Sequence, residues 1–141
     1  MRTLDNLIRL GRWRLDEQRR VVTDLDRLKD GLLAELARLA IDMEREAMLS
    51  QGDSEFAVAY PAWLRLALGR RDRLNASLAE ADAKLVVAQD DLRECFQELK
   101  RYETLAEGRT KRERAAVERR QNAELDEIGL ARFRRAAGQG A

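Results

Sequence analysis

The stretch LNASLAEADAKLVVAQDDLRECFQEL, residues 74–99, decides the fold, because apolar side chains recur in it at alternating steps of four and three residues. This spacing places them on one stripe of an α-helix and is the a/d pattern of a coiled coil. Continued outward, the same steps carry the stripe from Tyr60 to Ala106. All of its positions except Arg71 are apolar: Tyr60, Leu64, Ala67, Arg71, Leu74, Leu78, Ala81, Leu85, Ala88, Leu92, Cys95, Leu99, Tyr102 and Ala106.

A second stripe with the same spacing runs from Leu4 to Met43 in the first part of the chain. Nine of its twelve positions are apolar: Leu4, Ile8, Gly11, Leu15, Gln18, Val22, Leu25, Lys29, Leu32, Leu36, Leu39 and Met43. Leu7, Leu10, Val21, Leu28 and Leu33 widen it. Large leucines here face the many alanines of the other stripe, which predicts two closely packed helices.

Turn residues separate the two stripes and indicate a helical hairpin. Gly52 can end the first helix, Asp53 or Ser54 can cap the second, and Pro61 suits an early helical position or a kink. If the hairpin centres near residue 55, Leu4 faces Ala106 and Met43 faces Ala67. Both stripes then end at the same level, which favours an antiparallel pair over two separate dimerisation zippers.

The predicted fold class is therefore all-α, a long two-helix antiparallel coiled-coil hairpin with an overhanging C-terminal helix. We expect one coiled-coil domain over residues 1–141. Within it, we expect helix 1 at about 2–50, a turn or short helix at 51–60, helix 2 at about 61–135, and a frayed tail at 136–141.

Helical sequence continues beyond Ala106, but the four-and-three positions are no longer mainly apolar. It therefore lacks a seam, the apolar stripe along which two helices pack. This overhang, residues 109–135, is a candidate binding element. It is basic at first and ends with a few apolar side chains. The candidate contact residues are Arg109, Lys111, Arg112, Arg114, Arg119, Arg120, Leu125, Ile128 and Phe133. An isolated helix of this kind is marginal, so the overhang is either stabilised by a partner or solvated and partly frayed. Glu124, Asp126 and Glu127 would repel phosphate, so no nucleic-acid partner is expected.

The hairpin tip is a second candidate, because apolar side chains gather around the turn. They are Met43, Ala47, Met48, Leu49, Phe56, Val58, Tyr60, Trp63 and Leu66. Exposed methionine and aromatic clusters suggest a binding patch; alternatively, residues 54–60 fold over them as a cap. Trp13, beside several arginines, either packs along the second helix near Leu99 and Tyr102 or is exposed to a partner.

Composition argues against catalysis and against a bilayer. There is no histidine and one cysteine, Cys95, so the common zinc sites are excluded, and no glycine-rich phosphate loop is present. No cofactor and no enzymatic activity are expected. No apolar run reaches the roughly 20 residues of a membrane-spanning helix. A single thiol at a seam position fits a reducing cytoplasm.

Two stretches resemble a known family. Residues 7–20, LIRLGRWRLDEQRR, resemble the opening helix of the flagellar export protein FliJ in its alphaproteobacterial branch. Residues 96–103, FQELKRYE, followed by ELDEI at 124–128, resemble its later helix. The resemblance covers nearly the whole chain.

The resemblance implies a soluble, non-catalytic stalk-like coiled coil, similar to the central stalk subunit of rotary ATPases. It implies a cytoplasmic part of the flagellar type III export apparatus, peripherally associated with the inner membrane. The implied partners are the hexameric export ATPase, the cytoplasmic domain of the membrane export gate, and export chaperones. The implied gate-binding residues are Met43, Ala47, Tyr60, Trp63 and Ala67, and the overhang, with the start of helix 1, would enter the ATPase ring.

Two alternatives remain open at this stage. One is a homodimeric coiled-coil scaffold or adaptor without an ATPase, which sedimentation would distinguish from a monomeric rod. The other is the stalk protein of a non-flagellar type III injection system.

Overall fold

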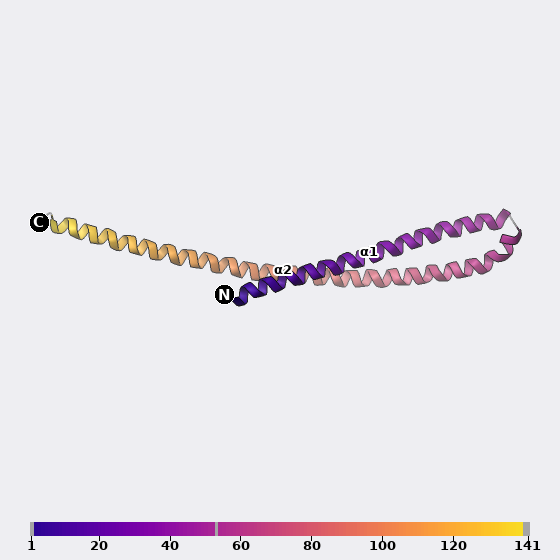
Figure 1. The fold of residues 1–141 in the computed structure, drawn as a ribbon, viewed down its shortest axis with the longest axis horizontal. Helices are drawn as coiled ribbons and strands as arrows, with labels where there is room; N and C mark the ends of the chain where they lie inside the picture. Colours follow the sequence, from indigo (N-terminus) through magenta and orange to yellow (C-terminus); the bar gives the residue numbers. More distant parts are fainter. Residues whose placement is uncertain (1, 53, 140–141) are drawn as a thin grey trace. The chain divides into compact units, whose positions relative to one another are not determined.

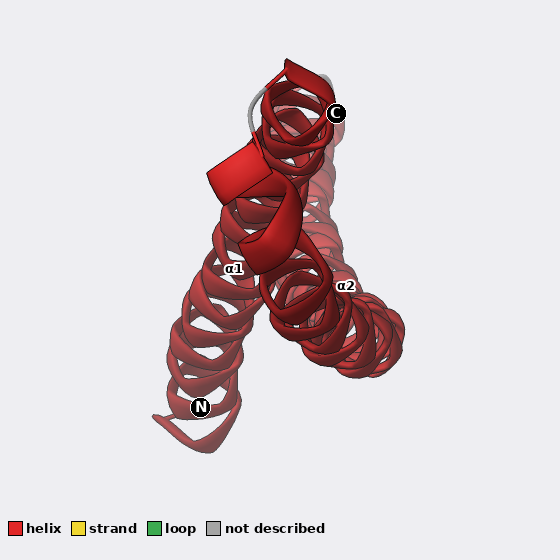
Figure 2. Ribbon diagram, turned by 90° about the vertical axis from the view of Figure 1, so that its right-hand side faces the viewer, coloured by secondary structure: helices red, strands yellow, loops and turns green. Residues whose placement is uncertain are grey.

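The computed structural model describes residues 2–52 and 54–139, and this part of the chain is helical throughout (Figure 2). Helix α1 spans Arg2–Gly52 and helix α2 spans Ser54–Gln139 (Figure 1). The prediction of an all-α helical hairpin is confirmed. The junction between the helices is short because both remain helical up to it.

The helices are longer than their predicted bounds. α2 begins at Ser54 and passes through Pro61, so residues 54–60 are helical and continuous with the main helix. Residues 136–139, expected to fray, are also helical, because Ala136 and Ala137 are strong helix formers. The remainder of the predicted tail, 140–141, and Asp53 of the predicted turn lie outside the described residues.

Contacts within the chain group the residues into two units. The hairpin unit is Gly11–Gln97, and the terminal unit is Met1–Leu10 together with Glu98–Ala141. The sequence predicts a single domain for the same chain. The division falls within both helices rather than at a linker.

The predicted stripes form the seam of the hairpin unit. Every stripe position between Gly11 and Cys95 is buried or half-buried, except Arg71. The proposed widening is wrong for four of its five residues, which are exposed: Leu10, Val21, Leu28 and Leu33. One neighbouring helix covers only a narrow stripe, so off-stripe leucines and valines stay at the surface.

Several contacts between the helices bear on the predicted register of the seam. Gln18 Nε2 donates a hydrogen bond to the Ala88 carbonyl at 3.1 Å. Glu35 pairs with Arg70 at 4.0 Å, and Leu39, Ala67 and Leu74 form a buried cluster. The Lys29–Asp82 ion pair at 3.0 Å fits a centre near residue 55, and the other two polar contacts, which long side chains make, fit a centre slightly closer to the junction. Met43 still packs on the cluster that contains Ala67.

Pro61 is a weak point in α2, since its ring removes one backbone N–H and crowds the carbonyl of Ala57. Pro61 is exposed and lies eight residues into the helix. We expect Pro61→Ala to raise the free energy of unfolding by about 1–3 kcal/mol. Urea unfolding followed by circular dichroism measures this. Gly129→Ala is the comparison, with an expected gain of about 1 kcal/mol from helix propensity alone. A loss of stability on Pro61→Ala would contradict the prediction.

In the terminal unit the seam is short, and the part of α2 beyond it has no buried stripe. Leu4, Leu7 and Ile8 are half-buried, and Leu99 is buried. Tyr102 and Ala106 are half-buried, and the Tyr102 hydroxyl donates to Glu98 Oε1 at 2.9 Å. Beyond Arg109 every described side chain up to residue 138 is exposed, apart from the half-buried Ala116. The predicted end of the seam after Ala106 is confirmed.

Candidate partner-binding surfaces

Of the five residues assigned to the tip by resemblance, Ala67 is buried and the other four are half-buried. Ala67 is only 6% exposed and belongs to the buried cluster, against which Met43 and Trp63 pack. Tyr60 and Trp63 stack with ring centroids 6.3 Å apart and an interplanar angle of 21°. The carbonyl of Ala47 accepts a hydrogen bond from Ser50 Oγ at 2.7 Å. These residues shape the tip, and all of them except Ala67 keep part of their side chain at the surface.

The exposed apolar surface of the tip comes from their neighbours. We call this surface the tip patch; it consists of Met48, Leu49, Phe56, Val58 and Leu66. Met48, Val58 and Leu66 are 70%, 83% and 75% exposed. The alternative in which residues 54–60 cap the tip is therefore wrong: these residues are helical, and the side chains of residues 54–59 are themselves exposed. Exposed apolar side chains that form a contiguous patch often mark a site of protein contact.

Trp13 is also exposed, at 61% of its surface. The interpretation as a ring packed along the other helix is therefore wrong. An exposed partner contact is the alternative that remains.

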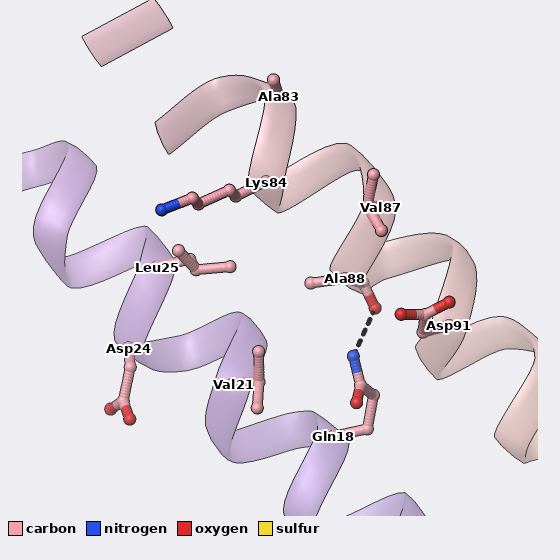
Figure 3. A pocket seen from close by; sticks show the side chains of 9 residues that line it. All are labelled: Gln18, Val21, Asp24, Leu25, Ala83, Lys84, Val87, Ala88 and Asp91. Atoms are coloured by element: carbon pink, nitrogen blue, oxygen red, sulfur yellow. Dashed lines mark hydrogen bonds between the residues drawn. The ribbon is translucent and has the colours of Figure 1, made fainter. Parts of the chain in front are cut away.

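An open groove runs beside the seam in the middle of the hairpin unit (Figure 3). Its volume is about 680 Å³. It is lined from α1 by Gln18, Val21, Asp24 and Leu25, and from α2 by Ala83, Lys84, Val87, Ala88 and Asp91. The Gln18 amide crosses the seam at one end of the groove to reach the Ala88 carbonyl (Figure 3). The groove was not predicted from the sequence. The apolar residues Val21, Ala83 and Val87, which lie beside the stripes and line the groove, could have indicated it.

The overhang presents the predicted basic residues on an exposed helix. Lys111, Arg112, Arg114, Arg119 and Arg120 are exposed, and Arg109 is half-buried. Arg109 Nε lies 3.5 Å from Glu113 Oε1, and Arg119 Nε donates to the Ala115 carbonyl at 3.3 Å. Exposed pairs of this kind contribute at most about 1 kcal/mol each. The helix therefore gains little stability from its own side chains.

Apolar residues accompany these charges along the overhang. Val117 borders a surface hollow of about 450 Å³ with Thr110, Glu113, Arg114 and Glu118. Leu125, Ile128 and Phe133 are exposed as well. The three apolar residues singled out by the sequence analysis are thus available to a partner.

Among the described residues, no helix is long and apolar enough to span a bilayer. In the same part of the chain, no group of His, Cys, Asp and Glu side chains could hold a metal ion.

A comparison with protein-family models matches residues 1–138 to the family described as flagellar FliJ protein. No curated protein matches the chain, and no solved structure does. The match spans both helices, the tip and the overhang. The chain therefore belongs to the flagellar FliJ family, whose members are non-enzymatic components of the flagellar protein export apparatus.

Proposed function

We propose that the chain is a stalk that links the export ATPase to the export gate and to export chaperones. The observation that carries this proposal is the overhang: a long helical segment without a seam, exposed and rich in arginine. Helix formation without tertiary packing is marginal, so such a segment gains most from a partner that surrounds it.

The overhang is the proposed ATPase-binding element. Its basic residues, Arg109, Lys111, Arg112, Arg114, Arg119 and Arg120, would face acidic side chains of the ATPase ring. Leu125, Ile128 and Phe133 would supply apolar contacts. Mixed charged and apolar surfaces of this kind give specificity and fast association as well as affinity.

The tip is the proposed gate-binding element. The tip patch would supply the contact surface, and Met43, Ala47, Tyr60, Trp63 and Ala67 would hold it in shape. This differs from the direct contact implied by the resemblance, because Ala67 is buried. Chaperones are proposed as further partners, with the chain acting at the cytoplasmic side of the inner membrane.

Charge reversal of the overhang tests the ATPase assignment. We expect the triple variant Arg112→Glu, Arg119→Glu, Arg120→Glu to weaken ATPase binding at least tenfold, about 1.4 kcal/mol, because attraction becomes repulsion. Co-purification and stimulation of ATP hydrolysis measure this, while binding to the gate domain should persist.

The matched control reverses three exposed arginines of the hairpin unit. Arg27→Glu, Arg38→Glu and Arg73→Glu produce the same change in net charge. This control should bind the ATPase normally. Equal binding by the overhang variant and the control would rule out ring insertion of the basic segment.

A further inference from the structure

The terminal unit contains an internal sequence repeat that begins where its seam ends. Ala106 is the last half-buried residue of the stripe, and apolar residues recur eleven positions later at Val117 and again at Ile128. The residues before them recur at the same spacing: Arg109 with Arg120, Thr110 with Gln121, and Glu113 with Glu124. Eleven residues make about three turns of an α-helix, so repeated positions share one face. The overhang therefore has a periodic face of its own.

This face continues the seam of the terminal unit. On α2 that seam consists of Leu99, Tyr102 and Ala106. Eleven residues further along, the same face carries Thr110, Glu113 and Val117. The steps become four, three and four, so a search by heptads loses the face after Ala106. A helix packed on it would lie in line with the first turns of α1, whose Leu4, Leu7 and Ile8 are half-buried.

The face also has the shape that receives a side chain from a neighbouring helix. In coiled coils, an apolar side chain enters a hole formed by four residues of the facing helix. The hollow of about 450 Å³ beside Val117 is bordered by Thr110, Glu113, Arg114, Val117 and Glu118, all from α2. The first four are spaced i, i+3, i+4 and i+7, which is the spacing of such a hole. The sequence repeats this set eleven residues later as Gln121, Glu124, Leu125 and Ile128.

The charge around the first hole indicates which kind of helix fits it. Residues 109–120 contain six basic and two acidic side chains, a net charge of +4. Glu113 is already paired with Arg109, whose Nε lies 3.5 Å from Glu113 Oε1. A second copy of the chain would add the same excess of positive charge. Charge complementarity therefore favours an acidic helix from a different protein.

We propose that the overhang binds an acidic partner helix that continues the line of α1 and inserts two apolar side chains, eleven residues apart, at Val117 and Ile128. The assignment of this helix to the export ATPase rests on the proposed function. Successive helix positions differ by about 100°, so the arginines of the overhang are distributed all around it. The apolar face, in contrast, has a single direction. It therefore fixes how the partner is oriented on the overhang.

Substitution of the two apolar residues tests the face without changing charge. Val117 and Ile128 are 46% and 49% exposed, so Val117→Gln with Ile128→Gln should leave helix content unchanged. We expect this variant to bind the export ATPase about tenfold more weakly, because both inserted side chains lose apolar contact. The control is Leu105→Gln with Leu130→Gln, since both leucines are exposed and lie on the opposite face of α2. It should bind like the unmodified chain.

Insertions test whether the face must stay in line with the seam. Two alanines inserted after Glu107 turn the overhang by about 200° relative to the seam, whereas four alanines turn it by only about 40°. We expect the shorter insertion to weaken ATPase binding about tenfold, and the longer one to weaken it less than about threefold. Circular dichroism checks that both insertions preserve the helix. Binding that falls with insertion length, regardless of the turn, would contradict the proposal.

The ATPase-binding measurements also separate this binding mode from the proposed function. If the arginine triple variant loses the ATPase while the glutamine variant and both insertions bind normally, ATPase binding stands and the in-line helix is wrong. If the unmodified chain does not bind the ATPase, the proposed function fails and the in-line helix fails with it. If sedimentation shows a dimer that the glutamine variant converts to a monomer, the face binds a second copy and the acidic partner is wrong.

Discussion

Replacing Leu85 with alanine is expected to lower the free energy of unfolding by about 2–5 kcal/mol, as is usual for buried leucines. Leu85 is 8% exposed in the middle of the hairpin seam. A two-helix seam contains few such residues, and typical domains have only about 5–15 kcal/mol of net stability. The loss should be visible as a large drop in the urea midpoint, measured by circular dichroism.

Leu105→Ala is the matched control, because Leu105 is also in α2 but exposed. Its effect should stay within about 0.5 kcal/mol. The midpoint of the unmodified chain should also be independent of protein concentration, since the seam pairs two helices of one chain. Equal losses in the two variants, or a midpoint that rises with concentration, would instead favour a homodimeric scaffold.

The second large effect is expected at the tip patch. The triple variant Met48→Asp, Val58→Asp, Leu66→Asp should lower affinity for the gate cytoplasmic domain at least a hundredfold, about 2.7 kcal/mol. Its physical basis is that carboxylates would have to be buried where apolar side chains make the contact. Helix content should persist, because all three side chains are exposed. Titration with the gate domain and swimming in soft agar measure the loss.

The same substitutions elsewhere on the helices provide the control. Leu28→Asp, Val86→Asp and Leu105→Asp change three exposed apolar residues that lie outside the tip patch. This control should bind the gate domain and support swimming. If it fails to the same degree as the tip variant, the effect is general and the tip assignment is lost.

The seam could be predicted from the sequence because it depends on spacing alone. The steps from Leu4 and from Tyr60 identify the buried and half-buried positions, with Arg71 as the exposed exception. The same steps show that the seam stops before Glu113, since charged residues then occupy the stripe. What remained uncertain was the surface beside the stripe, where burial of Val21 or Leu28 depends on how much one helix can cover.

The register was predicted by matching the ends of the two stripes, and Met43 packs on the cluster that contains Ala67. The junction was less accessible to prediction, because apolar burial along the stripes does not depend on the length of the turn. A longer turn was expected around Pro61, whereas α2 is helical from Ser54. The tip residues were assigned to contact by resemblance, whereas the spacing alone places Ala67 on the stripe, where it is buried.

The short junction between α1 and α2 has a consequence for the order of folding. Residues near the junction are close in sequence to their partners, while Gln18 must find Ala88 across seventy positions. Loop closure costs more entropy as the separation grows, so pairing is expected to begin beside the junction and to zip towards the ends. During synthesis the leucines of α1 leave the ribosome long before their partners. The newly made chain therefore exposes the apolar stripe of α1 until the facing part of α2 has been translated.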